Sequence, residues 1–271
     1  MDDIARSPAN ASLSGLQDYA TQVFAVAAAE FAKLGHDPWE LVTRAVQPIL
    51  WLLLFGEVMA RVRGLSTGNV SYVDFLAPGI LAQTVLFVAI FYGISAIWER
   101  DLGVLHRYMV SPAPRSALVL GKAVSSGVRG LAQAVFIYIC AAVIGVDLNW
   151  SPVNLLLVVG LVTLGSGLFS TFSLVIACMV KTRERFMGIG QIMTMPIFFA
   201  SNAIYPIAIM PPWLKIVSSF NPLTYEVDGL RALMLRGGIA TYGIAYDFGL
   251  LTLVAAMFVI LATAVYPRMT Q

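Results

Sequence analysis

Long apolar stretches separated by short polar segments dominate the sequence after residue 40. They cover about 41–60, 75–97, 117–146, 153–180, 186–208 and 244–266. An α-helix needs about 20 apolar residues to cross roughly 30 Å of hydrocarbon, so the pattern predicts six transmembrane helices. The first stretch carries Arg44 and Glu57 near its ends, and the fifth contains Gln191, Pro196 and Asn202.

The composition indicates that lipid covers part of the chain. Hydrophobic residues make up 59% of the 271 positions and charged residues 12%, whereas a soluble domain has about 25% charged residues. The mean hydropathy is +0.81. A soluble protein could not bury this much apolar surface, and the net charge of +2 gives no reason to expect a nucleic-acid partner. We expect an all-α polytopic membrane protein.

The distribution of basic residues predicts the orientation. One set of connecting segments carries about twice as many Lys and Arg residues as the other, and the richer set should be cytoplasmic. The richer set comprises residues 1–44, 98–122, 181–185 and the C-terminal tail; the other comprises 61–74, 147–152 and 205–243. Both termini are therefore expected on the cytoplasmic side of the cell (inner or plasma) membrane.

Residues 16–34 place apolar side chains at helical spacing but are too polar to span a bilayer. The pattern is typical of a helix that lies in the membrane interface. A soluble helix packed on a partner is the alternative.

The segment 201–240 does not fit a simple loop. Pro211 and Pro212 precede a short apolar helix; Asn221 is then an expected N-cap, with Pro222 at the first helical position and Gly237-Gly238 as the stop. Both helices are too short to cross the bilayer, so we expect a helix pair that dips back into the outer leaflet or lies on it.

The second of these short helices has an apolar stripe, formed by Leu223, Val227, Leu230 and Met234. Glu226 and Arg231 are expected elsewhere on its surface.

Sequence motifs of an enzyme or a metal site were not found. The chain contains no GxxxxGK[ST] phosphate loop, HExxH, paired CxxC or GxSxG. The apolar stretches hold few acidic residues: Glu57 lies near an outer end and Asp247 at the edge of the sixth span. Ion-driven carriers usually keep acids at mid-membrane depth, so transport by this chain, if it occurs, would need energy from another chain.

Two polar features remain. Arg129 lies in the third span, about 10 Å deep at ~1.5 Å per residue, with Gln133 one turn further on. The arginine either pairs with an acid or carbonyl, or extends to the interface. The segment 98–116 mixes charges with Trp98, Leu102 and other apolar residues; it is either an interfacial loop or a helix that docks on a partner.

Three stretches together resemble the type-2 ABC exporter permeases, in the branch of drug-resistance and nodulation-factor exporters. They are FLAPGILAQTVLF at 75–87, WERDLGVLHRYMVSPAPRSALVLGK at 98–122 and NPLTYEVDGLRALM at 221–234. The resemblance implies two copies of this chain with two copies of an ABC ATP-binding subunit, which would hold the ATP and Mg; this chain itself would need no cofactor. It also implies a cytoplasmic tail at 1–15, an amphipathic elbow helix at 16–37, a six-span domain at 41–271, a coupling helix at about 99–112 and re-entrant helices at 210–236.

The resemblance also implies roles for individual residues. Residues expected at the ATP-binding subunit are Glu99, Arg100, Gly103, Leu105, Arg107 and Met109. Residues expected along the substrate path or gate, bounded by spans one, two and five, are Phe87, Phe91, Tyr92, Phe198, Phe199, Asn202, Asn221 and Tyr225. The implied activity is ATP-driven export of an amphipathic or hydrophobic substrate such as a drug, lipid or lipid-linked glycan. An ion-coupled carrier or channel and a non-transporting assembly factor are the alternatives, and a related permease could replace the second copy.

Overall fold

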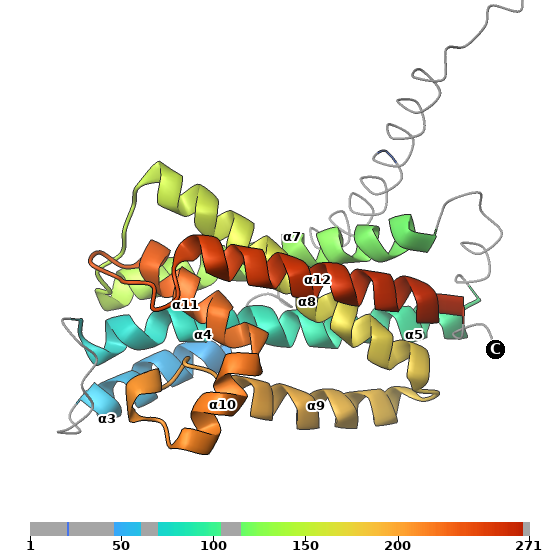
Figure 1. The fold of residues 1–271 in the computed structure, drawn as a ribbon, viewed down its shortest axis with the longest axis horizontal. Coiled ribbons are helices and arrows are strands. Elements are labelled where there is room, and N and C mark those ends of the chain that lie inside the picture. The colour runs from blue at the N-terminus through green and yellow to red at the C-terminus, as the bar shows by residue number, and fades with distance from the viewer. Residues whose placement is uncertain (1–20, 22–45, 61–69, 104–114, 268–271) are drawn as a thin grey trace, which may run out of the picture.

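A computed structural model describes residues 21, 46–60, 70–103 and 115–267, which form an elongated bundle of helices (Figure 1). The helices are η1 (Trp51–Phe55), α3 (Gly56–Ala60), α4 (Tyr72–Tyr92), α5 (Ile94–Asp101), α7 (Arg115–Ile144), α8 (Pro152–Met179), α9 (Arg183–Phe199), η2 (Ile207–Ile209), α10 (Pro212–Phe220), α11 (Pro222–Met234) and α12 (Ile244–Val265). The described residues contain no strand, which confirms the all-α prediction.

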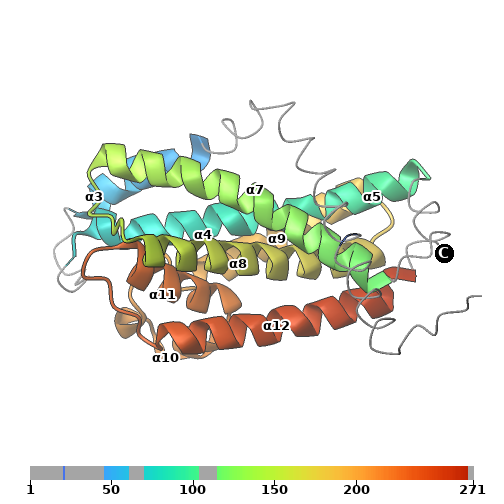
Figure 2. The same cartoon turned by 90° about the horizontal axis from the view of Figure 1, so that it is seen from above.

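Within the described residues, four helices are long and apolar enough to cross a membrane. They are Tyr72–Asp101, which combines α4 and α5, and then α7, α8 and α12. The second, third, fourth and sixth predicted spans are thereby confirmed as helices. α8 is central: it packs against α4, α7 and α12, and Figure 2 shows it between α7 and α12.

The first and fifth predicted spans differ from the expectation. The first is described from Val46, and its helix changes to π geometry over Trp51–Phe55. The fifth was expected as one helix over 186–208, but α9 ends at Phe199 after 17 residues. At ~1.5 Å per residue this is roughly 25 Å, short of the hydrocarbon thickness.

A turn at residues 200–206 replaces the second half of the expected fifth span. This turn packs closely on α4. A Cβ at Gly79 would lie 2.9 Å from the Cα of Ala203, so only glycine allows this approach. The Tyr72 hydroxyl donates a hydrogen bond to the Ile204 carbonyl at 2.9 Å. These contacts hold residues 200–206 against α4 rather than in line with α9.

The predicted coupling helix at 99–112 also begins differently. Glu99, Arg100 and Asp101 form the last turn of α5, and Gly103 breaks the helix with a φ of 70°. Residues 104–112 lie outside the described residues, as does the predicted elbow helix apart from Thr21.

The described connecting segments gather at two ends of the bundle. At one end the Arg100 guanidinium donates to the carbonyls of Val180 and Lys181, at 3.2 and 2.6 Å. At the other end the backbone N–H of Asn149 donates to the Met234 carbonyl at 2.8 Å. The loops near 102 and 181 therefore share one end, and the loops near 149 and 236 share the other.

The helices α10 and α11 form the predicted pair, and the N-cap prediction is confirmed. The Asn221 side-chain oxygen accepts a hydrogen bond from the Leu223 N–H at 3.0 Å, with Pro222 at the first helical position. The helix ends at Met234, before Gly237 adopts a φ of 74°.

The expectation that Glu226 and Arg231 lie on the surface of α11 is wrong. Glu226 is fully buried and Arg231 is 8% exposed. The physical reason is that α11 is enclosed by α4, α8 and α12, so its polar side has no access to solvent. Only α10 keeps an outward face, which includes Trp213 and Phe220.

We expect Asn221→Ala to lower the stability of the permease by about 1–2 kcal/mol. The substitution removes the cap of α11 and also the 2.6 Å hydrogen bond from the Asn221 amide to the Ile197 carbonyl of α9. Unfolding of the purified protein in detergent, titrated with SDS, measures the change. Asn221→Asp keeps the cap but cannot donate to Ile197, so it separates the two contributions; equal stability of all three proteins would contradict the prediction.

Candidate functional site

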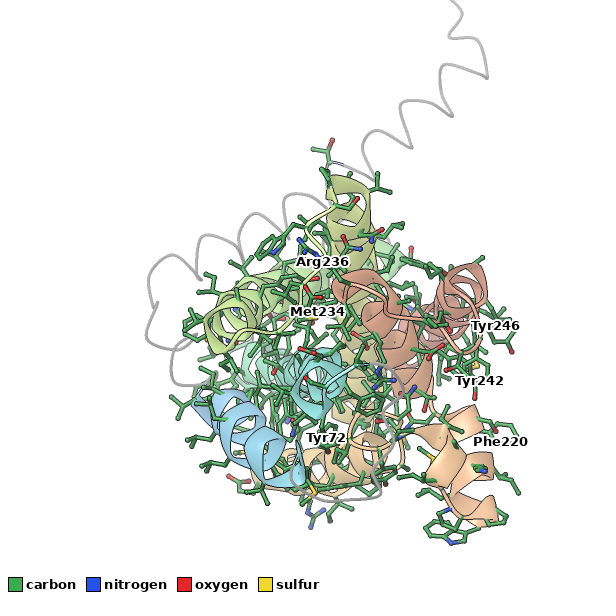
Figure 3. The ribbon with its side chains drawn as sticks, turned by 90° about the vertical axis from the view of Figure 1, so that its left-hand side faces the viewer. Tyr72, Phe220, Met234, Arg236, Tyr242 and Tyr246 are labelled. Carbon is green, nitrogen blue, oxygen red and sulfur yellow. The ribbon has the colours of Figure 1, made fainter. Side chains whose placement is uncertain are left out.

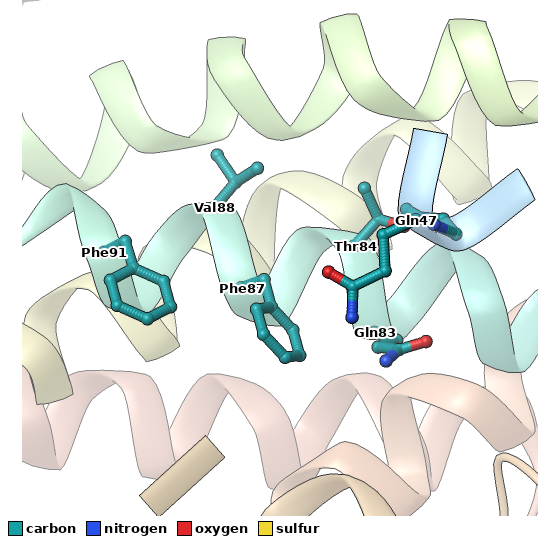
Figure 4. A pocket seen from close by; sticks show the side chains of 7 residues that line it. Gln47, Gln83, Thr84, Phe87, Val88 and Phe91 are labelled. Atoms are coloured by element: carbon teal, nitrogen blue, oxygen red, sulfur yellow. The ribbon is translucent and has the colours of Figure 1, made fainter. Parts of the chain in front are cut away.

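A pocket of about 190 Å³ lies between α4 and the helical segment at 46–60, which we call the first helix. Gln47 and Pro48 line it from the first helix, and Gln83, Thr84, Phe87, Val88 and Phe91 line it from α4. Figure 4 shows Phe87 and Phe91 one turn apart on the same side of α4, with Gln83 further along. The lining combines aromatic faces with two amides, which suits an amphipathic molecule.

Phe87 and Phe91 therefore line the same pocket, and α9 flanks them. A Cβ at Gly190 of α9 would lie 3.7 Å from the Phe91 ring. The spans expected to bound the path are thus adjacent at this point.

Tyr92 points elsewhere. It is buried, and its ring faces α7, where Lys122 and Arg129 approach to 5.9 and 5.2 Å from the ring centroid. Arg129 thus has an aromatic neighbour in the protein, and Gln133 of the same helix is fully buried.

The other expected path residues lie in α9, in the turn after it, and in α11 and its N-cap. Phe198 is fully buried against Trp51, with ring centroids 6.4 Å apart, and Phe199 is 42% exposed beside it. Asn202, Asn221 and Tyr225 are buried. The Tyr225 hydroxyl donates to the Ser219 carbonyl at 2.7 Å, which joins α11 to α10.

Four residues link the end of α5 to the start of α9, and we call them the α5–α9 clamp: Trp98, Arg100, Asp101 and Arg183. Asp101 pairs with Arg183 at 2.8 Å and with Arg100 at 3.2 Å. The Arg183 guanidinium lies 3.6 Å from the Trp98 ring centroid. The clamp fixes the segment that precedes residues 104–114 onto the neighbouring helix.

Glu99 is engaged within the chain. Both of its carboxylate oxygens accept hydrogen bonds from Lys122 of α7, at 2.8 and 2.7 Å. The two side chains are only 15% and 10% exposed. Of the residues expected at the ATP-binding subunit, Glu99 and Arg100 thus form contacts inside this chain, Gly103 lies in the turn after α5, and Leu105, Arg107 and Met109 lie outside the described residues.

Sequence reasoning missed a group of buried charges on α11 and α12. Glu226, Asp228 and Asp247 are fully buried, and Arg231 is nearly so. The Arg231 guanidinium donates to the Asn202 carbonyl at 2.9 Å and lies 3.8 Å from the Phe75 ring centroid. The signal in the sequence was three charged residues on a 13-residue helix between apolar segments, which the amphipathic interpretation assigned to an open surface.

Burial changes the acidity of these groups. It raises the pKa of Glu226 well above its ordinary value, which favours the protonated carboxyl. Burial lowers the pKa of Arg231 to about 10 against the opposing effect of Asp228, so the guanidinium stays charged at neutral pH. The carboxyl of Glu226 also packs directly on Gly165 of α8.

These features define a multi-pass helical membrane protein. It has a mostly apolar pocket between two helices, and ion pairs join α5 to its neighbours at one end of the bundle. Comparison with known proteins is consistent with this class. The sequence profile of the ABC-2 type transporter family matches residues 21–235. The chain belongs to the ABC-2 type transporter family, and it is a transporter permease subunit.

Several relatives carry related names. A transport permease named ycf38 from Porphyra purpurea is 31% identical over 205 residues, covering 74% of this chain and 69% of the relative. The daunorubicin resistance ABC transporter permease protein DrrB1 of Streptomyces coeruleorubidus is 25% identical over 224 residues, covering 82% and 76%. Nodulation protein J of Rhizobium leguminosarum bv. trifolii is 24% identical over 230 residues, covering 84% and 86%. Family membership implies association with an ABC ATP-binding subunit.

Proposed function

We propose that this chain is the permease half of an ATP-driven exporter that moves an amphipathic or hydrophobic molecule out of the cytoplasm or the inner leaflet. Two copies would pair with two ATP-binding subunits, which hold the ATP and Mg. The observation that carries the proposal is the pocket between the first helix and α4, lined by Phe87, Phe91 and the amides of Gln47 and Gln83. Such a lining accepts an apolar body and one polar group.

The finer topology belongs to the same proposal. The first helix and α9 would act as spans one and five, with both termini cytoplasmic and the α10–α11 pair dipping into the outer leaflet. An internal helix pair of this kind needs its partners inside the protein, because unsatisfied backbone groups are costly in lipid. The burial of α11 among α4, α8 and α12 supports that placement.

The alternative of an ion-coupled carrier is weighed against the number of buried acidic residues. The scarcity of acids argued against it, yet three carboxyl groups, of Glu226, Asp228 and Asp247, are fully buried. Membership of the ABC-2 family now favours ATP as the energy source. The assembly-factor alternative is disfavoured by relatives named as transport permeases.

Glu99 and Arg100 are poor positions for testing the coupling to the ATP-binding subunit, because both form contacts inside this chain. Reversing either charge would break bonds inside this chain, so folding and docking would fail together. Leu102 follows α5 directly and is 70% exposed, which makes it the better probe of a partner groove.

We expect Leu102→Asp to leave the permease folded but to weaken its complex with the ATP-binding subunit by at least roughly tenfold, since a charge would enter an apolar contact. The permease should be co-expressed with its ABC ATP-binding subunit and reconstituted in liposomes. Co-purification, ATP hydrolysis and ATP-dependent movement of rhodamine 6G would be measured.

Ile239→Asp is the matched control, because Ile239 is 80% exposed and lies three residues after Arg236, whose N–H donates to the Asp147 carbonyl at the other end of the bundle. It should leave the complex intact. Normal co-purification and normal ATP-dependent transport with Leu102→Asp would remove the docking role from this segment. Rhodamine 6G movement by the unmodified complex without ATP would contradict ATP-driven export itself.

A further inference from the structure

Three tyrosines cluster where α11 meets the start of α12, and we call them the tyrosine cluster: Tyr225, Tyr242 and Tyr246. Their ring centroids are 5.0, 5.9 and 6.2 Å apart. Tyr225 is buried, whereas Tyr242 and Tyr246 are 38% and 54% exposed. Figure 3 shows Tyr242 and Tyr246 on the same side of the molecule as Phe220, opposite the first helix. The cluster thus presents aromatic surface outward, away from the pocket at Phe87 and Phe91.

Two carboxyl groups lie directly behind this aromatic surface. Asp228 accepts a hydrogen bond from the Tyr242 N–H at 2.9 Å through one oxygen. Neither its other oxygen nor either oxygen of Asp247 accepts a hydrogen bond from any described residue, and both side chains are fully buried. Burial raises the pKa of Tyr242, and the charges of Asp228 and Asp247 raise it further. The Asp228 carboxyl group thus contacts the backbone of Tyr242, and Asp247 directly follows Tyr246 in α12.

Arg231 offsets only part of this negative charge, through its electrostatic interaction with Asp228. Its guanidinium is committed to the Asn202 carbonyl and the Phe75 ring, on the α4 side of α11. Two buried carboxyl groups thus lie beside the tyrosine cluster with one arginine turned toward other partners.

An apolar groove of about 350 Å³ adjoins the cluster at Tyr225. Its other lining residues are Leu168, Phe169, Phe172, Ile197, Ser219, Phe220, Pro222, Leu250, Val254, Met257 and Phe258. Among the described residues that line it, none is Lys or Arg. The groove has room for a hydrocarbon chain.

We propose that the tyrosine cluster and this groove form a second binding site, which takes a cationic amphiphile. The ammonium group would lie on the outward faces of Tyr242 and Tyr246, because aromatic rings attract cations through their negative faces. Asp228 and Asp247 add attraction from behind the rings. The apolar tail would lie in the groove, where each buried methylene contributes to binding.

The same features favour a free cation over a zwitterionic lipid. A choline lipid brings a phosphate beside its ammonium group, and that phosphate would meet two carboxyl groups without a basic side chain in the groove lining. The site does not depend on ATP or on transport, so it can be tested on the purified chain alone, separately from the proposed export activity.

The test is equilibrium binding of radiolabelled tetradecyltrimethylammonium to the full chain in dodecyl maltoside. We expect saturable binding that is at least roughly tenfold tighter than that of the uncharged tert-butyl isostere, because only the cation gains from the rings and carboxyl groups. Tyr246→Leu and Asp247→Asn should each weaken binding by about tenfold, and Tyr246→Phe should keep most of it. Tyr246 is the best position because it is the most exposed of the three, so its substitution leaves the fold intact.

Trp213→Leu is the matched control, since Trp213 is an aromatic residue of α10 that is 65% exposed and outside the cluster. An equal loss with Trp213→Leu would assign the tyrosines to membrane anchoring and overturn the proposal. Equal binding of the neutral isostere would show that the groove binds apolar chains without recognising a cation, which would also overturn the proposal. Full binding by Asp247→Asn would remove the carboxyl group from the site, and displacement by lysophosphatidylcholine at equal concentration would make the occupant a lipid.

Discussion

Replacement of Arg231 by Met is expected to destabilise the folded permease by about 3–5 kcal/mol. Arg231 is 8% exposed and lies among the buried carboxyl groups of α11. Methionine keeps an unbranched apolar side chain but removes the guanidinium that lies over the Phe75 ring, the charge that interacts with Asp228 and the 2.9 Å hydrogen bond to Asn202. The Asn202 carbonyl is then left without this donor in a region closed to solvent. Free energies of unfolding from SDS titration in mixed micelles measure the loss.

Arg231→Lys is the informative control. It keeps the charge but not the planar group that reaches the Asn202 carbonyl and stacks on Phe75, so it should recover only part of the stability. Arg231→Met combined with Asp228→Asn should cost less than Arg231→Met alone, because the uncompensated carboxyl group is removed as well. If Arg231→Met left the midpoint unchanged, the charge would contribute nothing to the fold.

The sequence predicts the long helices well because their signal is continuous. α7, α8 and α12 each contain an apolar run that is long enough to predict a membrane-spanning helix without knowledge of the neighbouring helices. The N-cap at Asn221 was equally predictable, since Asn followed by Pro is a local signal. By contrast, the end of α9 at Phe199 depends on Gly79 of α4, which admits the backbone of Ala203. That contact joins residues that are distant in the chain.

The candidate sites were likewise predictable where the signal is local, and not predictable where it depends on contacts between helices. That Phe87 and Phe91 line one pocket follows from their spacing of one turn on one helix. The orientation of Tyr92 toward α7 could have been expected from its position one residue beyond Phe91, which turns it by about 100°. The partner of Glu99 could not be predicted, because Lys122 lies in another helix. Glu226 and Arg231 were misplaced because helical periodicity shows which side is polar but not what covers it.

The ion pair between Glu99 and Lys122 is expected to give the other large effect. Glu99→Gln or Lys122→Gln alone should each cost about 3–5 kcal/mol, because each leaves one charge buried at the junction of α5 and α7. The double substitution should cost clearly less than the sum, with a coupling energy of roughly 1.5 kcal/mol or more. The same SDS titration would measure all four proteins.

Exchanging the two residues distinguishes the pair from its surroundings. Glu99→Lys with Lys122→Glu restores opposite charges, but it removes the ammonium group that lies 5.9 Å from the Tyr92 centroid and places a carboxylate near that ring. The exchange should therefore recover only part of the lost stability, and adding Tyr92→Leu should reduce the remaining difference. Additive single effects would mean that the two charges are stabilised independently. Full recovery by the exchange alone would show that the Tyr92 ring contributes nothing to holding Lys122 at the start of α7.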